Sequence, residues 1–267
     1  MDVNQIRFSI FLGIFILMLV LEHFLPRHPL VDSKLRRFAV NFLITGLDIV
    51  LVKLIFGAAA VGAAVYASEQ GWGLFNILDL PSGVEIFLAV VILDFMIYLQ
   101  HVVVHLVPMF WWFHVVHHSD LDLDVSSGLR FHPVEILVSM LLKVGVVCLL
   151  GPSPLAVLVF EAILNGMALI THSNVRLPLA LDKVLRWLVV TPDMHRIHHS
   201  VEPDETDSNY GFNLSIWDRL FKTYRPHARK DQPEILIGVK EFQGKEELTF
   251  WKLLLMPLLK GGRQVEH

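Results

Sequence analysis

Residues 84–118 decide the fold, and they read VEIFLAVVILDFMIYLQHVVVHLVPMFWWFHVVHH. The apolar part, from Val84 to Leu106, is long enough for a membrane-spanning helix, which needs about 20 residues. The end of this run carries one cluster of histidines, and the segment beyond Pro108 carries another. Within each cluster histidines lie three or four positions apart, and residues at this spacing share one face of a helix. Each cluster therefore directs its imidazoles at a common point, as binding of a metal ion requires. The clusters are His101/His105 and His114/His117/His118.

A third cluster of the same kind, His195/His198/His199, occurs far along the chain. Neutral imidazole is the usual side-chain ligand of iron, zinc and copper. Eight converging imidazoles are too many for one ion with four to six positions, so the three clusters predict two ions. A site for two metals in so apolar a chain indicates oxidative chemistry on a lipid.

The composition excludes several other classes of protein. The chain of 267 residues is 54% hydrophobic and only 18% charged, with a mean hydropathy of +0.55, whereas soluble domains carry roughly 25% charged residues. Its net charge of -4 argues against a nucleic-acid partner. The single cysteine, Cys148, lies in an apolar run and excludes iron–sulfur clusters and cysteine-based zinc sites.

Four further apolar runs accompany the run that ends at the first histidines. We therefore predict an all-α, polytopic integral membrane bundle of about five spans, or of four spans and a re-entrant hairpin, with a histidine-rich metal-binding cap. The first run has no small-residue cleavage pattern, so we interpret it as a span and not as a signal peptide. The four runs are 8–25, 38–66, 134–150 and 155–171.

Two details refine this prediction. The second run contains Asn41, Asp48 and Lys53, so we expect it to pack inside the bundle and not to face lipid on all sides. The last two runs are separated only by residues 151–154, Gly-Pro-Ser-Pro, and this short uncharged turn predicts a tight helical hairpin.

The charges of the connectors predict the orientation. The connector 26–37 carries four basic residues, whereas 67–83 carries Glu69 and Asp79 and no basic residue. The positive-inside rule then places 26–37 in the cytoplasm and 67–83 outside. Counting spans onward brings 106–133 and 172–267 to the cytoplasmic side, so all three histidine clusters meet on one face of the membrane.

Three segments of the expected cap need interpretation. Residues 177–190 and 248–259 mix leucines and tryptophan with charges, and we expect interfacial helices or amphipathic helices packed on the cap. Asp120, Asp122 and Asp124 form a short acidic run beside the second cluster. We interpret this run as a solvated loop, with docking of a partner as the alternative.

Several other residues are candidates for the site. His172 ends a polar stripe of the fifth span that includes Glu161 and Asn165, and we expect His172 to be a metal ligand. His132 stands at the start of the fourth span, where we favour a helix cap or a hydrogen bond to Glu135, and it is therefore a less certain ligand. Glu161, Asn165 and Asp94 are candidates to support the ligands, Asp94 by accepting an imidazole N–H.

The remaining histidines are isolated, and we expect no catalytic residue beyond the metal ligands. The isolated ones are His23, His28, His227 and His267. The expected ligands are His101, His105, His114, His117, His118, His172, His195, His198 and His199, and less certainly His132.

The ligand type favours iron. Zinc hydrolases have His-Glu-x-x-His motifs and soluble di-iron bundles have Glu-x-x-His pairs, and the sequence contains neither. Zinc also rarely takes more than four ligands. Copper is allowed by the ligand type. An all-histidine site suits iron that cycles between redox states and handles oxygen.

These motifs resemble those of the membrane-bound fatty acid hydroxylase / sterol desaturase superfamily. The resemblance covers about residues 84–225 and includes Asp94, the histidine clusters, His172 and three flanking stretches. The chain departs from many relatives at one point, since His101 is followed by Val102 and not by arginine, which weakens any transfer of a substrate preference. The flanking stretches are 130–135, 191–194 and 209–219.

The resemblance implies a non-heme di-iron centre with O2 as co-substrate and a lipid taken from the bilayer. It implies hydroxylation of an unactivated C–H bond of a fatty acyl, sterol or related lipid. Desaturation or ether-lipid oxygenation at the same site remains an alternative. No nicotinamide, flavin or heme motif occurs in the sequence, so we expect an external electron donor of the ferredoxin or cytochrome type.

A zinc-dependent membrane metalloprotein without redox chemistry is the alternative from another class. A metal carrier should have ligands distributed through the bilayer, whereas these lie at one face, which favours the enzyme. For the domain organisation we expect N-terminal transmembrane helices in 1–83, a catalytic domain in 84–225 and a cytoplasmic tail with an interfacial helix in 226–267.

Overall fold

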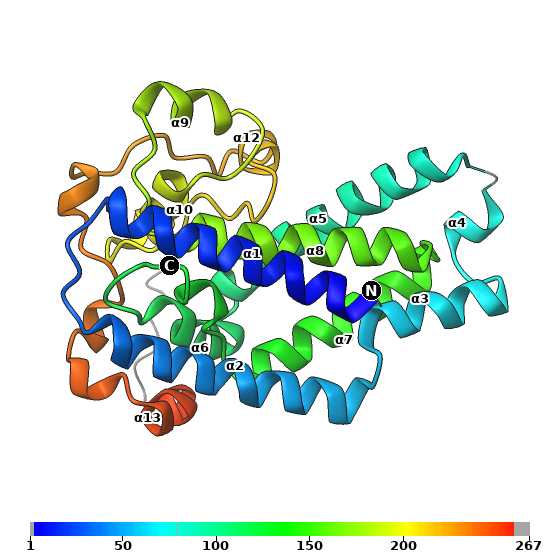
Figure 1. Ribbon diagram of the computed structural model, residues 1–267, viewed down its shortest axis with the longest axis horizontal. Coiled ribbons are helices and arrows are strands. Elements are labelled where there is room, and N and C mark those ends of the chain that lie inside the picture. Colours follow the sequence, from blue (N-terminus) through cyan, green and yellow to red (C-terminus); the bar gives the residue numbers. More distant parts are fainter. Residues whose placement is uncertain (1–2, 79, 259–267) are drawn as a thin grey trace.

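The computed structural model describes residues 3–78 and 80–258, and every regular element in that part is helical, as the sequence predicted (Figure 1). Its longest helices form the predicted bundle, in which five segments are long and apolar enough to cross a membrane. The long helices are α1 (Val3–Phe24), α2 (Lys34–Phe56), α5 (Ser82–Leu106), α7 (Pro133–Leu150) and α8 (Pro154–His172).

The second apolar run is longer than predicted and is broken once. The sequence predicted one span over 38–66, but α2 ends at Gly57 and a second helix, α3 (Ala59–Gln70), begins directly after it. Gly57 has φ +59°, a left-handed conformation that glycine adopts without steric penalty and that ends the helix. A single turn, α4 (Leu74–Ile77), follows, and the apolar segment extends as far as Ile77.

The predicted helical hairpin is present. Gly151 ends α7 with φ +63°, and Ser153 accepts a hydrogen bond from the backbone of Ala156 at the start of α8. A Cβ atom on Gly151 would lie 2.1 Å from the carbonyl oxygen of Trp72. The turn therefore requires glycine both for its conformation and for close packing against the link between α3 and α4.

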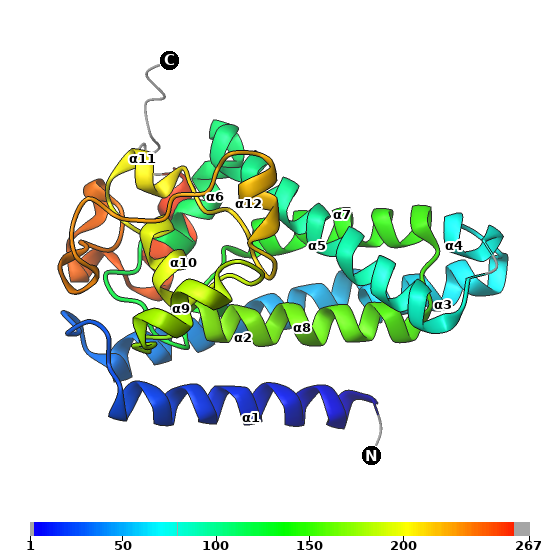
Figure 2. The same ribbon diagram turned by 90° about the horizontal axis from the view of Figure 1, so that it is seen from above.

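The shorter helices form a cap at one end of the bundle, and α3 and α4 lie at the opposite end (Figures 1 and 2). The connectors before α2, between α5 and α7 and after α8 all reach this capped end, so the three histidine clusters lie on one side of the bundle, as predicted. The helices of the cap are α6 (Pro108–His118), α9 (Leu179–Leu185), α10 (Pro192–His198), α11 (Pro203–Thr206), α12 (Ile216–Leu220) and α13 (Phe250–Leu255).

The acidic run of the cap is buried, so its interpretation as a solvated loop or docking segment was wrong. Asp120, Asp122 and Asp124 are at most 1% exposed. The guanidinium of Arg37, at the start of α2, donates to Asp120 Oδ1 at 2.7 Å and to Asp124 Oδ2 at 2.5 Å. Burial alone would raise the pKa of Asp120, but the charges of Arg37 and Arg130 hold it well below its usual range. The run is therefore an internal ion network that joins α2 to the cap.

The basic residues used to predict the orientation are all ion-paired. Arg37 pairs with Asp120, and the other three pair with acids of α1, of the connector itself and of α10. Because these pairs neutralise the connector, the cytoplasmic placement of the cap remains a prediction. The other pairs are Arg27–Asp193, Lys34–Glu22 and Arg36–Asp32.

The two segments expected to be interfacial form short helices, α9 and α13, with apolar side chains on the outside. In the first segment Leu179 is 71% and Trp187 65% exposed, and Trp251 of α13 is 72% exposed. Leu253 of α13 is fully buried, so this helix also packs on the cap. The last part of the second segment, from residue 259, lies outside the described residues.

Candidate metal centre

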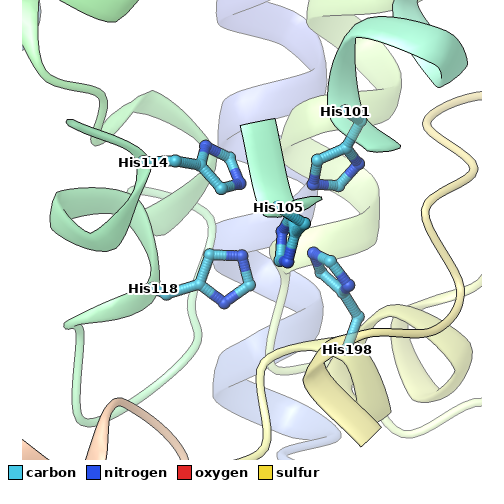
Figure 3. Close-up of side chains that lie close together, drawn as sticks. All are labelled: His101, His105, His114, His118 and His198. Carbon is cyan, nitrogen blue, oxygen red and sulfur yellow. The ribbon is translucent and has the colours of Figure 1, made fainter. Parts of the chain in front are cut away.

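Five histidines from three elements form the first group of the site. Their imidazoles point toward one another, with His105 between His114 and His118 on one side and His101 and His198 on the other (Figure 3). All five are buried, and one ligand atom from each lies within 4.8 Å of the others. The five are His101 and His105 from α5, His114 and His118 from α6, and His198 from α10.

Four more histidines form a second, neighbouring group. Nε2 of His172 lies 3.0 Å from Nε2 of His117 and 3.0 Å from Nε2 of His195. Nε2 of His199 lies 3.1 Å from Nε2 of His195. Two nitrogen ligands at about 2.1 Å from one ion and at a right angle to each other would lie about 3.0 Å apart, so this spacing suits a shared ion. His118 and His199, one from each group, stack with their ring centroids 4.4 Å apart.

In six of the nine rings, a partner of Nδ1 fixes which nitrogen faces the centre. Nδ1 donates to a backbone carbonyl in four histidines and lies beside a carboxylate in two others, which turns Nε2 inward. The carbonyl pairs are His101–Tyr210 at 2.7 Å, His117–Arg130 at 3.0 Å, His172–Ala168 at 2.8 Å and His198–Ser208 at 2.8 Å.

Two carboxylates lie beside the Nδ1 atoms of two further histidines. Nδ1 of His114 lies 2.6 Å from Oε1 of Glu135, which belongs to the first turn of α7. Nδ1 of His105 lies 3.3 Å from Oδ1 of Asp207. An acceptor on Nδ1 fixes the tautomer and raises the basicity of Nε2, the atom that binds metal.

Residues 208–218 are folded so that their carbonyls reach the histidines. Asn209 has φ +53°, and its side chain accepts from the backbone N of Arg225 at 2.8 Å. The carboxylate of Asp218 accepts from the backbone N of Tyr210 and of Gly211, both at 2.8 Å. A Cβ on Gly211 would lie 2.6 Å from that carboxylate, so only glycine permits this turn. Burial raises the pKa of Asp218 to about 6 despite these hydrogen bonds.

Burial favours the neutral form of four imidazoles in the cap. Burial lowers the pKa of His117, His118, His195 and His199 well below the ordinary value, and the neighbouring imidazoles lower it further. Neutral imidazole is the form that binds a metal ion, because its lone pair is available.

The buried nitrogens of the site fit a pair of metal ions. Nε2 of His101 and of His114, and both ring nitrogens of His118, are buried without a hydrogen-bond partner. A buried polar atom left in this way costs about 1–3 kcal/mol unless another ligand satisfies it. A metal ion in the five-histidine group would satisfy Nε2 of His101, Nε2 of His114 and one ring nitrogen of His118. All nine histidines that the sequence singled out as more certain ligands are thus in one of the two groups.

His132 is in neither group. Its Nδ1 accepts a hydrogen bond from the backbone N of Val134 at 3.1 Å, and its Nε2 lies 3.2 Å from the carbonyl oxygen of Leu254. Because both nitrogens are engaged with the backbone, His132 caps α7, which was one of the two favoured interpretations of it.

Asp94 does not accept a hydrogen bond from an imidazole, so its predicted role was wrong. Its Oδ2 accepts from Nε1 of Trp217 at 2.8 Å and from the backbone N of Leu214 at 3.3 Å. Asp94 therefore fastens α5 to residues 213–217, close to the turn that contacts His101.

Glu161 and Asn165 do not support a histidine either. Glu161 forms ion pairs with Arg7 at 2.7 Å and Lys143 at 3.5 Å, within the bundle. Asn165 lines a cavity that reaches His101, His114 and His117. The residues that do support the histidines, Glu135 and Asp207, were not predicted. The role of Glu135 could have been inferred from its position, because it is a carboxylate three residues after His132 at the start of an apolar helix.

A family profile and several curated proteins match this chain. The profile of the fatty acid hydroxylase family matches residues 86–223. The ornithine lipid hydroxylase of Rhizobium tropici is 34% identical over 69% of this chain and 53% of the relative. The alkylglycerol monooxygenase of Danio rerio is 29% identical over 93% of this chain and 53% of the relative.

The human alkylglycerol monooxygenase is 31% identical over 67% of this chain and 39% of the relative. The chain thus spans about half, or less, of the length of these curated relatives. No solved structure matches it.

Proposed function

Because this chain belongs to the fatty acid hydroxylase family, we propose that it is a membrane-bound, non-heme di-iron oxygenase that hydroxylates an unactivated C–H bond of a lipid. The observation that carries the proposal is the division of nine buried histidines into groups of five and four. Zinc rarely takes more than four protein ligands, so a five-histidine group favours iron. The group of four would hold the second ion.

The proposed ligands are His101, His105, His114, His118 and His198 for one iron and His117, His172, His195 and His199 for the other. When bound, the irons would reduce O2 with two electrons and two protons, so that one oxygen atom leaves as water and the other enters a C–H bond. The electrons would come from a separate donor of the ferredoxin or cytochrome type.

The protein's own contribution is to hold the imidazoles and exclude water. Phe131 stacks on His117 with ring centroids 4.3 Å apart, and Trp111 lies 4.9 Å from His105. These rings cover the centre with apolar surface, which limits access of water to the reacting atoms. Glu135 and Asp207 hold the orientation of His114 and His105, so the ligands are arranged before metal arrives.

Oxygenation of an ether lipid is a second candidate reaction on the same site. It is favoured by the similarity to proteins named alkylglycerol monooxygenase from several animals. The two candidates share the metal centre and differ in the carbon that is oxidised.

Metal analysis of the purified protein tests the proposal. We expect two irons per chain that couple magnetically in a Mössbauer spectrum, and O2 consumption that depends on an added reductant and a lipid. Stoichiometric zinc in metal-replete protein that consumes no O2 would instead support the zinc alternative. Incubation with monoalkylglycerol or with fatty acyl lipids, followed by mass spectrometry of the products, separates the two candidate reactions.

A further inference from the structure

A cavity of about 750 Å³ lies between α1, α2, α5, α7 and α8 and reaches the candidate metal centre. Its volume is in the range of pockets that bind small molecules, about 300–1,000 Å³. His101, His114 and His117 form part of its wall, and apolar side chains such as Ile97 and Phe212 form much of the rest. The cavity therefore suits an apolar chain that ends beside the histidines.

Two carboxyl groups from adjacent helices interrupt this apolar wall. Asp48 of α2 and Glu135 of α7 both line the cavity and are 6% and 9% exposed. Oδ1 of Asp48 and Oε2 of Glu135 are buried and accept no hydrogen bond. The other oxygen of Glu135 lies 2.6 Å from Nδ1 of His114. Asp48 lies about one turn after Thr45 in α2, and the Thr45 hydroxyl donates to the carbonyl of Leu129, also in the cavity wall, at 2.8 Å. The unpaired oxygens thus belong to the end of the cavity near the five-histidine group.

No ion pair within residues 3–78 and 80–258 supplies a cation to these oxygens. Lys143 and Arg7, which also line the cavity, form ion pairs with Glu161. Lys53 is exposed and forms no ion pair in the described part of the chain. A buried carboxyl oxygen without a partner is costly, and ionisable groups in membrane-spanning helices usually mark a functional site. A hydrogen-bond donor carried by a ligand would satisfy both oxygens.

We propose that Asp48, together with Glu135, is the polar subsite of the lipid-binding cavity and accepts hydrogen bonds from a hydroxyl or ammonium group of the substrate. The inference rests on the proposed function, since it assigns the substrate to the same cavity. Because Glu135 also holds His114, the donor group lies next to the metal centre. The oxidised carbon is then within a few bonds of that group and not at the far end of the chain.

A second polar region of the cavity wall, formed by Arg7 and Lys143, does not offer a comparable binding site for a lipid headgroup. Arg7 and Lys143 share the carboxylate of Glu161, so an anionic headgroup there would have to displace an existing ion pair. The two carboxyl groups near the histidines would repel the same anion. A lipid that bears a hydrogen-bond donor is therefore the complementary ligand.

Equilibrium binding of radiolabelled lipids to the purified holoprotein, without O2 or reductant, tests the proposal. The probes are 1-O-hexadecylglycerol, its di-O-methyl ether and hexadecylammonium. The wild type should bind the two donor-bearing probes at least about tenfold more tightly than the methyl ether, as the loss of buried hydrogen bonds implies.

Variants of Asp48 separate the two kinds of donor. Asp48→Leu should lose about tenfold in affinity for both donor-bearing probes and bind the methyl ether as the wild type does. Asp48→Asn keeps an acceptor but no charge, so it should retain affinity for the diol and lose it for the ammonium probe. Glu69→Gln, an equal change of charge at an exposed position of α3, is the matched control and should bind as the wild type does.

Equal affinity of the wild type for all three probes, or unchanged affinities in Asp48→Leu, would overturn the proposal. Iron content and the unfolding midpoint of each variant, measured beside the wild type, show whether the fold is retained. Asp48→Asn provides the test if Asp48→Leu does not fold. Absence of iron or of O2 consumption would contradict the proposed function, while the preference for a donor is measured without turnover and stands or falls separately.

Discussion

At the scale of single residues, the site depends on the partners of Nδ1 in six of its nine imidazoles. Backbone carbonyls of Tyr210, Arg130, Ala168 and Ser208 accept from Nδ1 of their histidines, so the inward direction of Nε2 is fixed by main-chain conformation. Glu135 does the same for His114 with a side chain. A substitution can remove the carboxylate of Glu135, whereas a backbone carbonyl remains whatever side chain is present. Glu135 is therefore the position at which the effect of an Nδ1 partner on metal binding can be tested.

Replacing one histidine from each group should remove one ion at a time. In His117→Ala and in His198→Ala we expect iron content to fall to about one per chain and activity to be lost, because each group loses a ligand. His227→Ala, at an exposed position outside both groups, should change neither. Metal analysis and O2 consumption measure the outcome. Full iron content in both alanine variants would show that the grouping is wrong.

Glu135→Gln should weaken iron binding without unfolding the protein. The amide can still accept from His114 but lacks the charge that raises ligand basicity, so we expect iron affinity to fall about 10–100-fold. Competition with a chelator measures the affinity, and Glu234→Gln, exposed on the cap, is the matched control. Equal iron affinities of Glu135→Gln and Glu234→Gln would show that the charge of Glu135 does not strengthen metal binding.

At the scale of elements, buried ions join the membrane helices to the cap. Arg37 begins α2, yet its guanidinium lies among Asp120, Asp124 and Ser127 in the loop that follows α6. The loop leads directly to Arg130, whose carbonyl orients His117. The position of the second histidine cluster therefore depends on the packing of α2 against this loop.

Arg37→Met should destabilise the whole cap. Removing one partner of a buried ion pair leaves uncompensated charges and costs about 3–5 kcal/mol. Arg36→Met, at the next residue, removes a partly exposed pair with Asp32, and such pairs contribute at most about 1 kcal/mol. The thermal unfolding midpoint in detergent should fall much further for Arg37→Met, and equal shifts would contradict the buried network.

At the scale of the whole molecule, five long helices carry the site at one end. Figure 2 shows the cap at one end of the bundle and the link through α3 and α4 at the other. The chain thus separates the end that holds the histidine groups, where three distant segments meet, from the end formed by α3 and α4.

We predict that the capped end is cytoplasmic. In a Cys148→Ser background, Lys230→Cys places a thiol on the cap and Glu69→Cys places one at the opposite end, both at exposed positions. A membrane-impermeant maleimide should label Glu69→Cys in intact cells, and should label Lys230→Cys only after permeabilisation. The reverse pattern would invert the orientation.

The sequence by itself determined the helical membrane bundle and the histidines that meet in it. Both follow from local patterns, since hydrophobic length sets a span and spacings of three and four set a helical face. It could not determine the division into groups of five and four, because which of His114, His117 and His118 joins which group depends on how α6 packs against α5 and α10.

Only the tertiary structure decided the roles of the polar residues around the site. The roles of Asp94 and of the acidic run were wrong and that of His132 was left open, because a polar side chain in an apolar segment signals that a partner exists but not which one it is. Their partners Trp217, Leu254 and Arg37 are distant in sequence, so the hydrogen bonds and ion pairs arise only when the chain is packed.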